Sequence, residues 1–174
     1  MSRLTVRNAI ANYLNAAQIN YVGAVKPTRD YVDGSDYDQR NLNGVISLIS
    51  SPTGSGCVLI VNLTDDRRQR EALTGRGQVN DIIRHTAKVE LFFANTSGSV
   101  PSAQTDYDSI VDGIFNAIRY DPTMGGVLWS SGEYAPWIEH SQSAPYTDSS
   151  GTLVFITGVV RFLAYEWLAG PASL

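Results

Sequence analysis

The chain has 174 residues and a formal net charge of −4; hydrophobic residues make up 43% of it and charged residues 17%. This length suits one domain with one core, and the hydrophobic share is large enough for that core to form. The acidic balance argues against general nucleic-acid binding, which needs basic residues to displace counterions from phosphates. The low charged fraction favours association with other subunits, because the centres of interfaces are depleted in charge.

Several functional classes lack their sequence signals. The single cysteine, Cys57, cannot form an internal disulfide and has no neighbouring Cys or His ligands for zinc. His85 and His140, the only histidines, lack the second ligand at helical spacing that a metal motif needs. No apolar run is long enough to span a membrane, and no export signal is recognisable near the N-terminus. We therefore expect no metal, no other cofactor and no membrane association.

The first third of the chain predicts a helix, a short strand and an arm. Apolar residues at helical spacing indicate a helix over Leu4–Ala17, and a strand is expected at Tyr21–Val25. The polar segment 26–43 has too few apolar residues for a core of its own, so we predict an extended arm. Its isolated Tyr31 and Tyr37 are candidates for docking on a neighbouring subunit.

A β-hairpin and a charged loop are predicted next. Gly44–Ser50 and Cys57–Leu63 are β-rich runs joined by a Pro- and Gly-containing turn, which favours a hairpin. Segment 64–79 is charged and interrupted by glycine, so we predict a mobile loop that is either simply solvated or contacts another subunit. The candidate contact residues in this loop are Asp65, Asp66, Arg67, Arg68, Arg70 and Arg76.

The second half of the chain carries the strongest periodic patterns. Alternation over Ile82–Ala94 predicts a strand with one buried face. Apolar residues from Tyr107 to Ile118 follow the 3,4 spacing of an amphipathic helix, for which Ser102 is a plausible N-cap. Two further strands, Trp137–Gln142 and Leu153–Trp167, are expected to form a hairpin.

These elements predict one α+β domain covering residues 1–174, with a frayed tail at 170–174. Its sheet is expected to be mainly antiparallel, with the two principal helices packed on one face. We place the functional contacts outside this scaffold, in the arm and the charged loop.

A small hydrolase or ligand-binding domain is the alternative from another functional class. Its candidate residues are Glu133, Glu139 and His140 near the aromatic Trp137, and they would have to converge in a deep pocket. Glu139 and His140 are neighbours in a predicted strand, where adjacent side chains point to opposite faces. Cys57 lies in an apolar strand, where a buried thiol is inert. We therefore predict no catalytic residues.

Three segments carry a resemblance to a known family. They are the helix near the start, the strand Arg84–Phe93, and the segment Tyr107–Trp129, in which a helix is followed by Asp-Pro-Thr-Met-Gly-Gly at residues 121–126. Together with a final hairpin over Ser149–Trp167, they resemble the tail terminator (tail-completion) proteins of long-tailed, siphovirus-type bacteriophages. Met124 stands where leucine is commoner in that family's turn, and the arm 26–43 has no counterpart that we can assign.

The resemblance implies a structural virion protein. It implies a ring, usually a homohexamer, that caps the phage tail tube, ends its polymerisation and provides the head-attachment surface. The implied partners are the tail tube protein and the head-tail connector protein, while DNA passes through the ring without specific binding. The protein would be assembled in the host cytoplasm and reside in the virion tail. Another neck or head-tail adaptor protein is the alternative within the same class.

Overall fold

The structure is a computed structural model. It describes residues 3–27, 54–72, 79–128 and 137–168, of which 65–72, 79–81 and 167–168 are described by their backbone alone. The elements in chain order are α1 (Arg3–Ala16), β1 (Val22–Lys26), β2 (Ser55–Ala72), β3 (Val79–Asn95), α3 (Val100–Tyr120), β4 (Ile138–Gln142), β5 (Tyr146–Thr147) and β6 (Val154–Leu168). The predicted hairpin strand at 44–50, residues 28–43 of the predicted arm and the tail at 170–174 lie outside the described residues. The first residue of the predicted arm, Lys26, belongs instead to β1.

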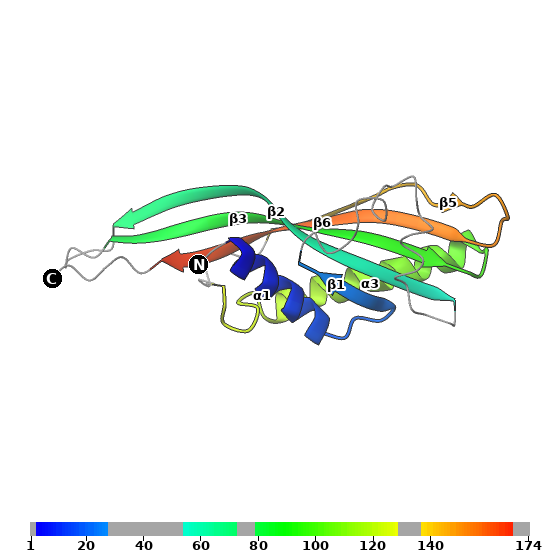
Figure 1. Ribbon diagram of the computed structural model, residues 1–174, viewed down its shortest axis with the longest axis horizontal. Helices are drawn as coiled ribbons and strands as arrows, with labels where there is room; N and C mark the ends of the chain where they lie inside the picture. Colours follow the sequence, from blue (N-terminus) through cyan, green and yellow to red (C-terminus); the bar gives the residue numbers. More distant parts are fainter. Residues whose placement is uncertain (1–2, 28–53, 73–78, 129–136, 169–174) are drawn as a thin grey trace.

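The strands form one six-stranded sheet in the order β1-β2-β3-β6-β4, with β5 also paired to β6. Only β1 runs parallel to its neighbour, β2; the other pairs are antiparallel. Both helices lie on the same side of this sheet, as Figure 1 shows. The predicted α+β class, with a mainly antiparallel sheet and two helices on one face, is therefore confirmed.

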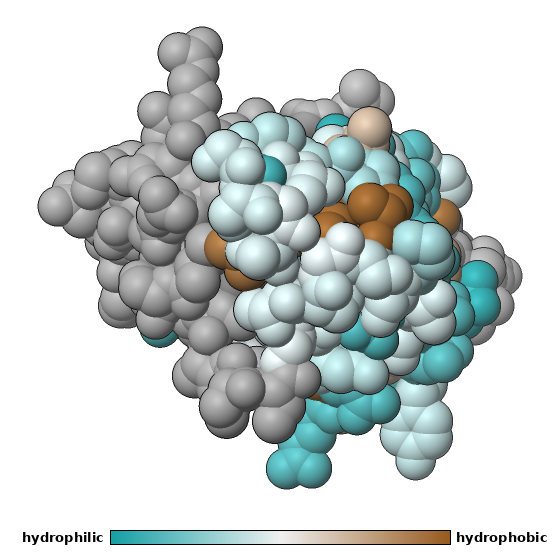
Figure 2. Space-filling model, turned by 90° about the vertical axis from the view of Figure 1, so that its right-hand side faces the viewer, coloured by the Kyte–Doolittle hydropathy of each residue, from teal (hydrophilic) through white to brown (hydrophobic). Residues whose placement is uncertain are grey.

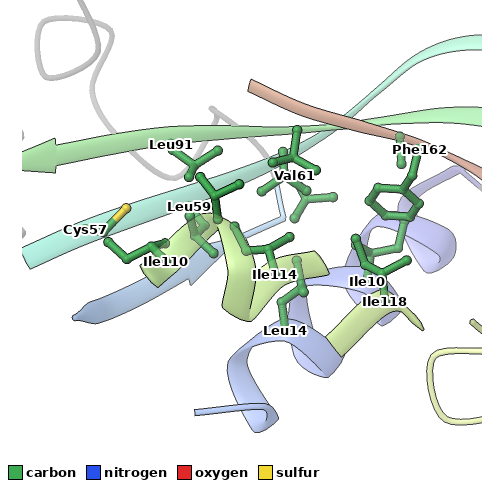
Figure 3. Packing of buried hydrophobic residues seen from close by; sticks show 14 of the residues in the cluster. Ile10, Leu14, Cys57, Leu59, Val61, Leu91, Ile110, Ile114, Ile118 and Phe162 are labelled. Carbon is green, nitrogen blue, oxygen red and sulfur yellow. The ribbon is translucent and has the colours of Figure 1, made fainter. Parts of the chain in front are cut away.

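The main core fills the space between the helices and the sheet (Figure 3). The predicted helical spacing in α3 buries Tyr107, Ile110, Ile114 and Ile118 against the strands. Each of these side chains is at most 1% exposed, so each contributes about 1.5–3 kcal/mol through removal of apolar surface from water. The other large side chains of this core that are almost fully buried are Ile10, Leu14, Leu59, Leu91, Phe93, Ile156 and Phe162.

Helix α3 starts earlier than its apolar pattern indicated. Ser99, not Ser102, is the N-cap: its backbone is extended and its side chain accepts a hydrogen bond from the backbone N–H of Ser102. Pro101 occupies the first turn, where its missing N–H costs nothing because the first N–H groups of a helix have no partner within the helix. The prediction of Ser102 as the cap was therefore wrong by three residues.

The sheet also buries side chains on the face opposite the helices. Val58, Ile60 and Phe92 form a second, small hydrophobic cluster, with the partly buried Ala24 packed against it. Glu90, on the same face of β3 as Phe92, is only 4% exposed. The alternation in β3 predicted one buried face, and this was wrong because the middle of the strand is covered on both sides.

Strands β2, β3 and β6 continue past the helices as a three-stranded ribbon (Figure 1). The predicted loop over 64–79 is wrong for residues 64–72, which belong to β2, and for Val79, which begins β3. Residues 65–72 pair residue by residue with β3. Their backbone groups find partners across the strands, and this outweighs a local composition that is typical of a loop. Residues 73–78 lie outside the described part.

Candidate functional site

Five of the predicted contact residues lie together on the ribbon. Asp65, Asp66, Arg67, Arg68 and Arg70 are positions of β2 that pair with β3 between Asp81 and Thr86. A strand holds such residues at fixed spacing, whereas a loop would let them move. The other three candidates, Tyr31, Tyr37 and Arg76, lie outside the described residues, so their predicted role stays a prediction.

The outer strands of the ribbon extend past the described ends of β1 and β4. On one side, β1 pairs with β2 no further than Lys26 opposite Ile60. On the other side, the pairing of β4 with β6 ends at Ile138 opposite Phe162. Beyond these points β2 and β6 each have a described strand neighbour only on the β3 side. Open strand edges are ready-made surfaces for pairing with another chain.

A buried polar pair lies where the core gives way to the ribbon. His85 Nε2 and Glu166 Oε2 are 3.1 Å apart, and the two side chains are 2% and 0% exposed. His85 lies next to Ala87 in the core-facing row of β3, and Glu166 lies next to Ala164 in the core-facing row of β6. A buried hydrogen-bonded pair is costly to break, since removing one member leaves the other without its partner in a water-poor site.

Of the residues proposed for an enzyme, the described ones do not converge. His140 is on the helix side of the sheet, where its Nε2 lies 3.0 Å from the Tyr107 hydroxyl. Glu139 lies on the other side and accepts a hydrogen bond of 3.0 Å from Arg161. Trp137 is 49% exposed, and Glu133 lies outside the described residues. The structure therefore separates His140 from Glu139, as expected for neighbours in a strand.

The environment of the Tyr107–His140 pair favours its uncharged form. Burial raises the pKa of the Tyr107 hydroxyl far above its usual value, with smaller contributions from Cys57 and Asp108. Burial lowers the pKa of His140, and the charge of Asp108 partly opposes this. The pair joins α3 to β4 through a hydrogen bond between neutral groups. The pair therefore serves as a structural contact between the helix and the strand.

A network of polar side chains ties the opposite end of the sheet to α3. The Ser55 hydroxyl donates to Asp106 Oδ2 at 2.5 Å, and Asn95 Nδ2 donates to both, at 2.7 Å to Ser55 and 3.2 Å to Asp106. Interaction with Asp106 also raises the pKa of Tyr21. Figure 2 views the molecule from this end and shows a mostly polar surface with small hydrophobic patches. Sequence reasoning missed this network because its members are far apart along the chain.

An open groove of about 850 Å³ runs between the end of α1 and the second half of α3. Tyr13, Ile19 and Gly113 are among its lining residues, and the Tyr13 hydroxyl donates to the Ala117 carbonyl at 2.9 Å. Tyr120 stands at this groove with 91% of its surface exposed. No periodic pattern pointed to this groove, because it forms where two helices distant in sequence meet.

The described residues contain no three His, Cys, Asp or Glu side chains placed together to hold a metal ion. In the same part of the chain, neither helix combines the length and hydrophobicity needed to cross a membrane. Cys57 is fully buried, and burial raises the pKa of its thiol. No model of a known protein family matches the sequence. A search of curated proteins likewise finds no relative.

Proposed function

We propose that this protein is a structural subunit of a ring that caps a phage tail tube. In this role it ends tube polymerisation and offers a surface to the head-side connector, without catalysing a reaction. The resemblance of the segments Arg84–Phe93 and Tyr107–Trp129 to tail terminator proteins suggests the partner class. The observation that carries the proposal is the β2-β3-β6 ribbon, whose outer strands extend past the described ends of β1 and β4.

The ribbon favours assembly for a physical reason. Soluble monomers normally shorten, twist or cover their edge strands, because open edges recruit other strands. Here the outer strands extend past the ends of β1 and β4, and the ribbon projects beyond the helices (Figure 1). A closed ring with head-to-tail contacts covers two different surfaces on every subunit at once. The two edges of the ribbon supply two such surfaces.

The polar side chains at the described sites form hydrogen bonds to other residues of the same chain. His140 bonds to Tyr107, Glu139 to Arg161, and Asp106 to Ser55 and Asn95. These contacts join helices to strands or strands to strands. They support a scaffold whose function lies in its surfaces. We place this scaffold in the virion tail, after assembly in the host cytoplasm.

Light-scattering mass in solution is the first test. We expect a discrete particle, about six times the mass of one chain, that does not grow with concentration. Tube protein polymerised in its presence should give shorter tubes than tube protein alone. A strictly monomeric mass at high concentration would contradict the proposal.

Charge reversal tests whether the ribbon takes part in assembly. Arg67→Glu combined with Arg68→Glu should reduce the ring population, because both positions lie on the part of β2 that extends past the described end of β1. Arg119→Glu, at an exposed position of α3, is the matched control and should leave the mass unchanged. An unchanged mass for the double variant would show that the charged part of β2 does not contribute to the assembly contacts.

Pull-down experiments distinguish a tail terminator from another neck adaptor. A terminator should retain tail tube protein, and the assembled complex should then retain the head-tail connector. Retention of connector protein alone would favour a neck or head-tail adaptor. Any bound DNA should be lost at moderate salt, since an acidic chain makes no strong net attraction to phosphates.

A further inference from the structure

The Tyr107 hydroxyl, on α3, has a single hydrogen-bond partner within the described part of the chain. Tyr107 is 0% exposed, and its hydroxyl oxygen lies 3.0 Å from Nε2 of His140 on β4. Because burial raises the pKa of the hydroxyl, the phenol keeps its hydrogen and donates a hydrogen bond to Nε2. His140 is therefore neutral in this contact, with its own ring hydrogen on Nδ1.

A second proton on His140 conflicts with this contact. Protonation of Nε2 places a hydrogen on both facing atoms, so the Tyr107 hydroxyl has to turn its own hydrogen away in order to accept the new bond. The hydroxyl has no second acceptor in hydrogen-bond geometry within the described part of the chain, and a buried donor without an acceptor is costly. Proton binding to His140 and its contact with Tyr107 therefore oppose each other.

The charges around His140 favour its movement toward solvent once it is protonated. Burial lowers the pKa of His140, whereas the negative charge of the exposed Asp108 on α3 partly opposes this. On β6, the residue paired with His140 is the apolar Val160. Glu139 and Arg161 lie on the other face of the sheet, where they bond to each other. The imidazolium is therefore stabilised by leaving its buried position for the water beside Asp108.

We propose that protonation of His140 breaks its contact with Tyr107, so that the attachment of β4 to α3 depends on pH. Strand β4 has five residues, Ile138–Gln142, and His140 is the middle one. The other side-chain contact between α3 and β4 in the described chain joins Gln104 to Gln142 at 3.2–3.3 Å near the surface, where water competes for it. Loss of the central contact therefore leaves β4 held mainly by its pairing with β6. This inference does not depend on the proposed ring.

Hydrogen–deuterium exchange of the backbone amides at pH 8 and pH 5 tests the inference, since these values bracket the ordinary histidine pKa of about 6.5. Protection factors are compared, because they correct for the intrinsic pH dependence of amide exchange. The protection of β4 should fall several-fold from the higher to the lower value, because the contact is stable above the ordinary pKa and is lost as the pH falls toward the lowered one. It should also stay below the protection of the buried Val89 and Leu91 in β3, which reports opening of the whole fold.

Two variants identify the groups that carry the response. His140→Gln keeps a hydrogen-bond acceptor for Tyr107 but cannot titrate, so the protection of β4 should be nearly equal at the two pH values. Tyr107→Phe removes the hydroxyl hydrogen that opposes protonation, so the fall in protection should be smaller than in the wild type. Tyr13→Phe is the matched control. It removes a hydroxyl that bonds to the Ala117 carbonyl elsewhere on α3, and it should leave the response of β4 unchanged.

Two results in the wild-type chain alone overturn the inference, so it can be tested even where a variant does not fold. One is equal protection of β4 at the two pH values. The other is protection of β4 that equals that of the β3 core at both values, because β4 then opens only with the whole fold. A fall that persists in His140→Gln, or that is unchanged in Tyr107→Phe, assigns the response to other groups and overturns the inference as well. A fall that disappears in His140→Gln and shrinks in Tyr107→Phe supports it.

Discussion

The Tyr107 hydroxyl lies directly over the backbone of Gly158. A Cβ atom added to Gly158 would lie 1.7 Å from the hydroxyl oxygen, far inside any allowed contact. The absence of a side chain on β6 thus lets the α3 tyrosine reach His140 on β4. One glycine therefore determines how closely α3 approaches the sheet.

Gly158→Ala should destabilise the fold by about 1–3 kcal/mol, because overpacking forces neighbouring atoms to move. The same change made in a Tyr107→Phe background should cost less, since the clashing hydroxyl is then gone. Chemical denaturation of the wild type, both single variants and the double variant gives the coupling between the two sites. Strictly additive changes would show that the hydroxyl and the glycine are not in contact.

The elements that carry the core could be predicted from the sequence. The buried residues of α3 and the core-facing residues of β3 recur with helical and strand periods, and a period is a local property of the chain. Burial of Ile110 and Ile114 follows directly from it. The fold class followed from the order of these elements, and the structure confirms it.

The extension of β2 could not be predicted, because its cause is not local. Asp65–Arg70 has the composition of a loop, and the strand forms through pairing with Asp81–Thr86. The polar contacts were missed for the same reason: His85 and Glu166 are 81 positions apart. Six of the predicted contact residues came from charge clustering in segment 64–79, and Tyr31 and Tyr37 came from their isolation in a polar arm. Five of them lie on β2, and their part in assembly stays a prediction.

His140 should make the stability of the fold depend on pH near neutrality. Burial lowers its pKa in the folded state below the ordinary value of 6.5, so the unfolded chain binds the proton more readily. This contribution to stability is complete above about pH 6.5 and is lost as the pH falls toward the folded-state pKa.

Urea unfolding between pH 8 and pH 5 measures this effect, with His140→Gln as the comparison; these limits bracket the ordinary histidine pKa of about 6.5. The wild type should lose stability faster than the variant as the pH falls. The other histidine, His85, is present in both proteins, so the difference isolates His140. Parallel pH profiles would mean that His140 protonates equally well in the folded and unfolded chains.

Asp121 organises the turn after α3. Its carboxylate accepts bonds from the Thr123 backbone N–H at 2.9 Å, the Thr123 hydroxyl at 2.5 Å and the Gly125 N–H at 2.8 Å. These bonds lower the pKa of Asp121, with the Thr123 hydroxyl as the largest cause. The turn places Met124, which is 3% exposed, against the core.

Asp121→Ala should destabilise the protein by about 1–2 kcal/mol, since hydrogen bonds to a charged group are worth more than neutral ones. Exposed Asp112 on the same helix provides the control Asp112→Ala, which should stay within about 0.5 kcal/mol. The Asp121 contribution should be complete above about pH 4 and decline as the pH falls through the folded-state pKa. Thermal unfolding at pH 7 and pH 3 tests both statements. If Asp121→Ala lowers stability equally at pH 7 and at pH 3, the charge of Asp121 does not have the proposed role.

The network of Ser55, Asn95 and Asp106 should contribute measurably to the stability of the fold. Ser55 and Asn95 are 7% and 2% exposed, so neither can exchange its lost partner freely for water. Asp106→Ala removes the acceptor of both the Ser55 hydroxyl and one Asn95 N–H bond. A buried donor left without an acceptor costs about 1–3 kcal/mol, and this is the expected loss in unfolding free energy.

Asp108→Ala is the matched control, because it removes the same side chain from the same helix. Asp108 is exposed and accepts a 2.7 Å bond from half-buried Gln104 one turn earlier, a type of contact worth about 0.2–0.5 kcal/mol. If the network ties the strand ends to α3, Asp106→Ala must cost clearly more than Asp108→Ala. Amide exchange near Asn95 should also accelerate in the Asp106 variant. Equal costs would mean that the loss of helix charge, and not the buried network, determines the stability of this end of the molecule.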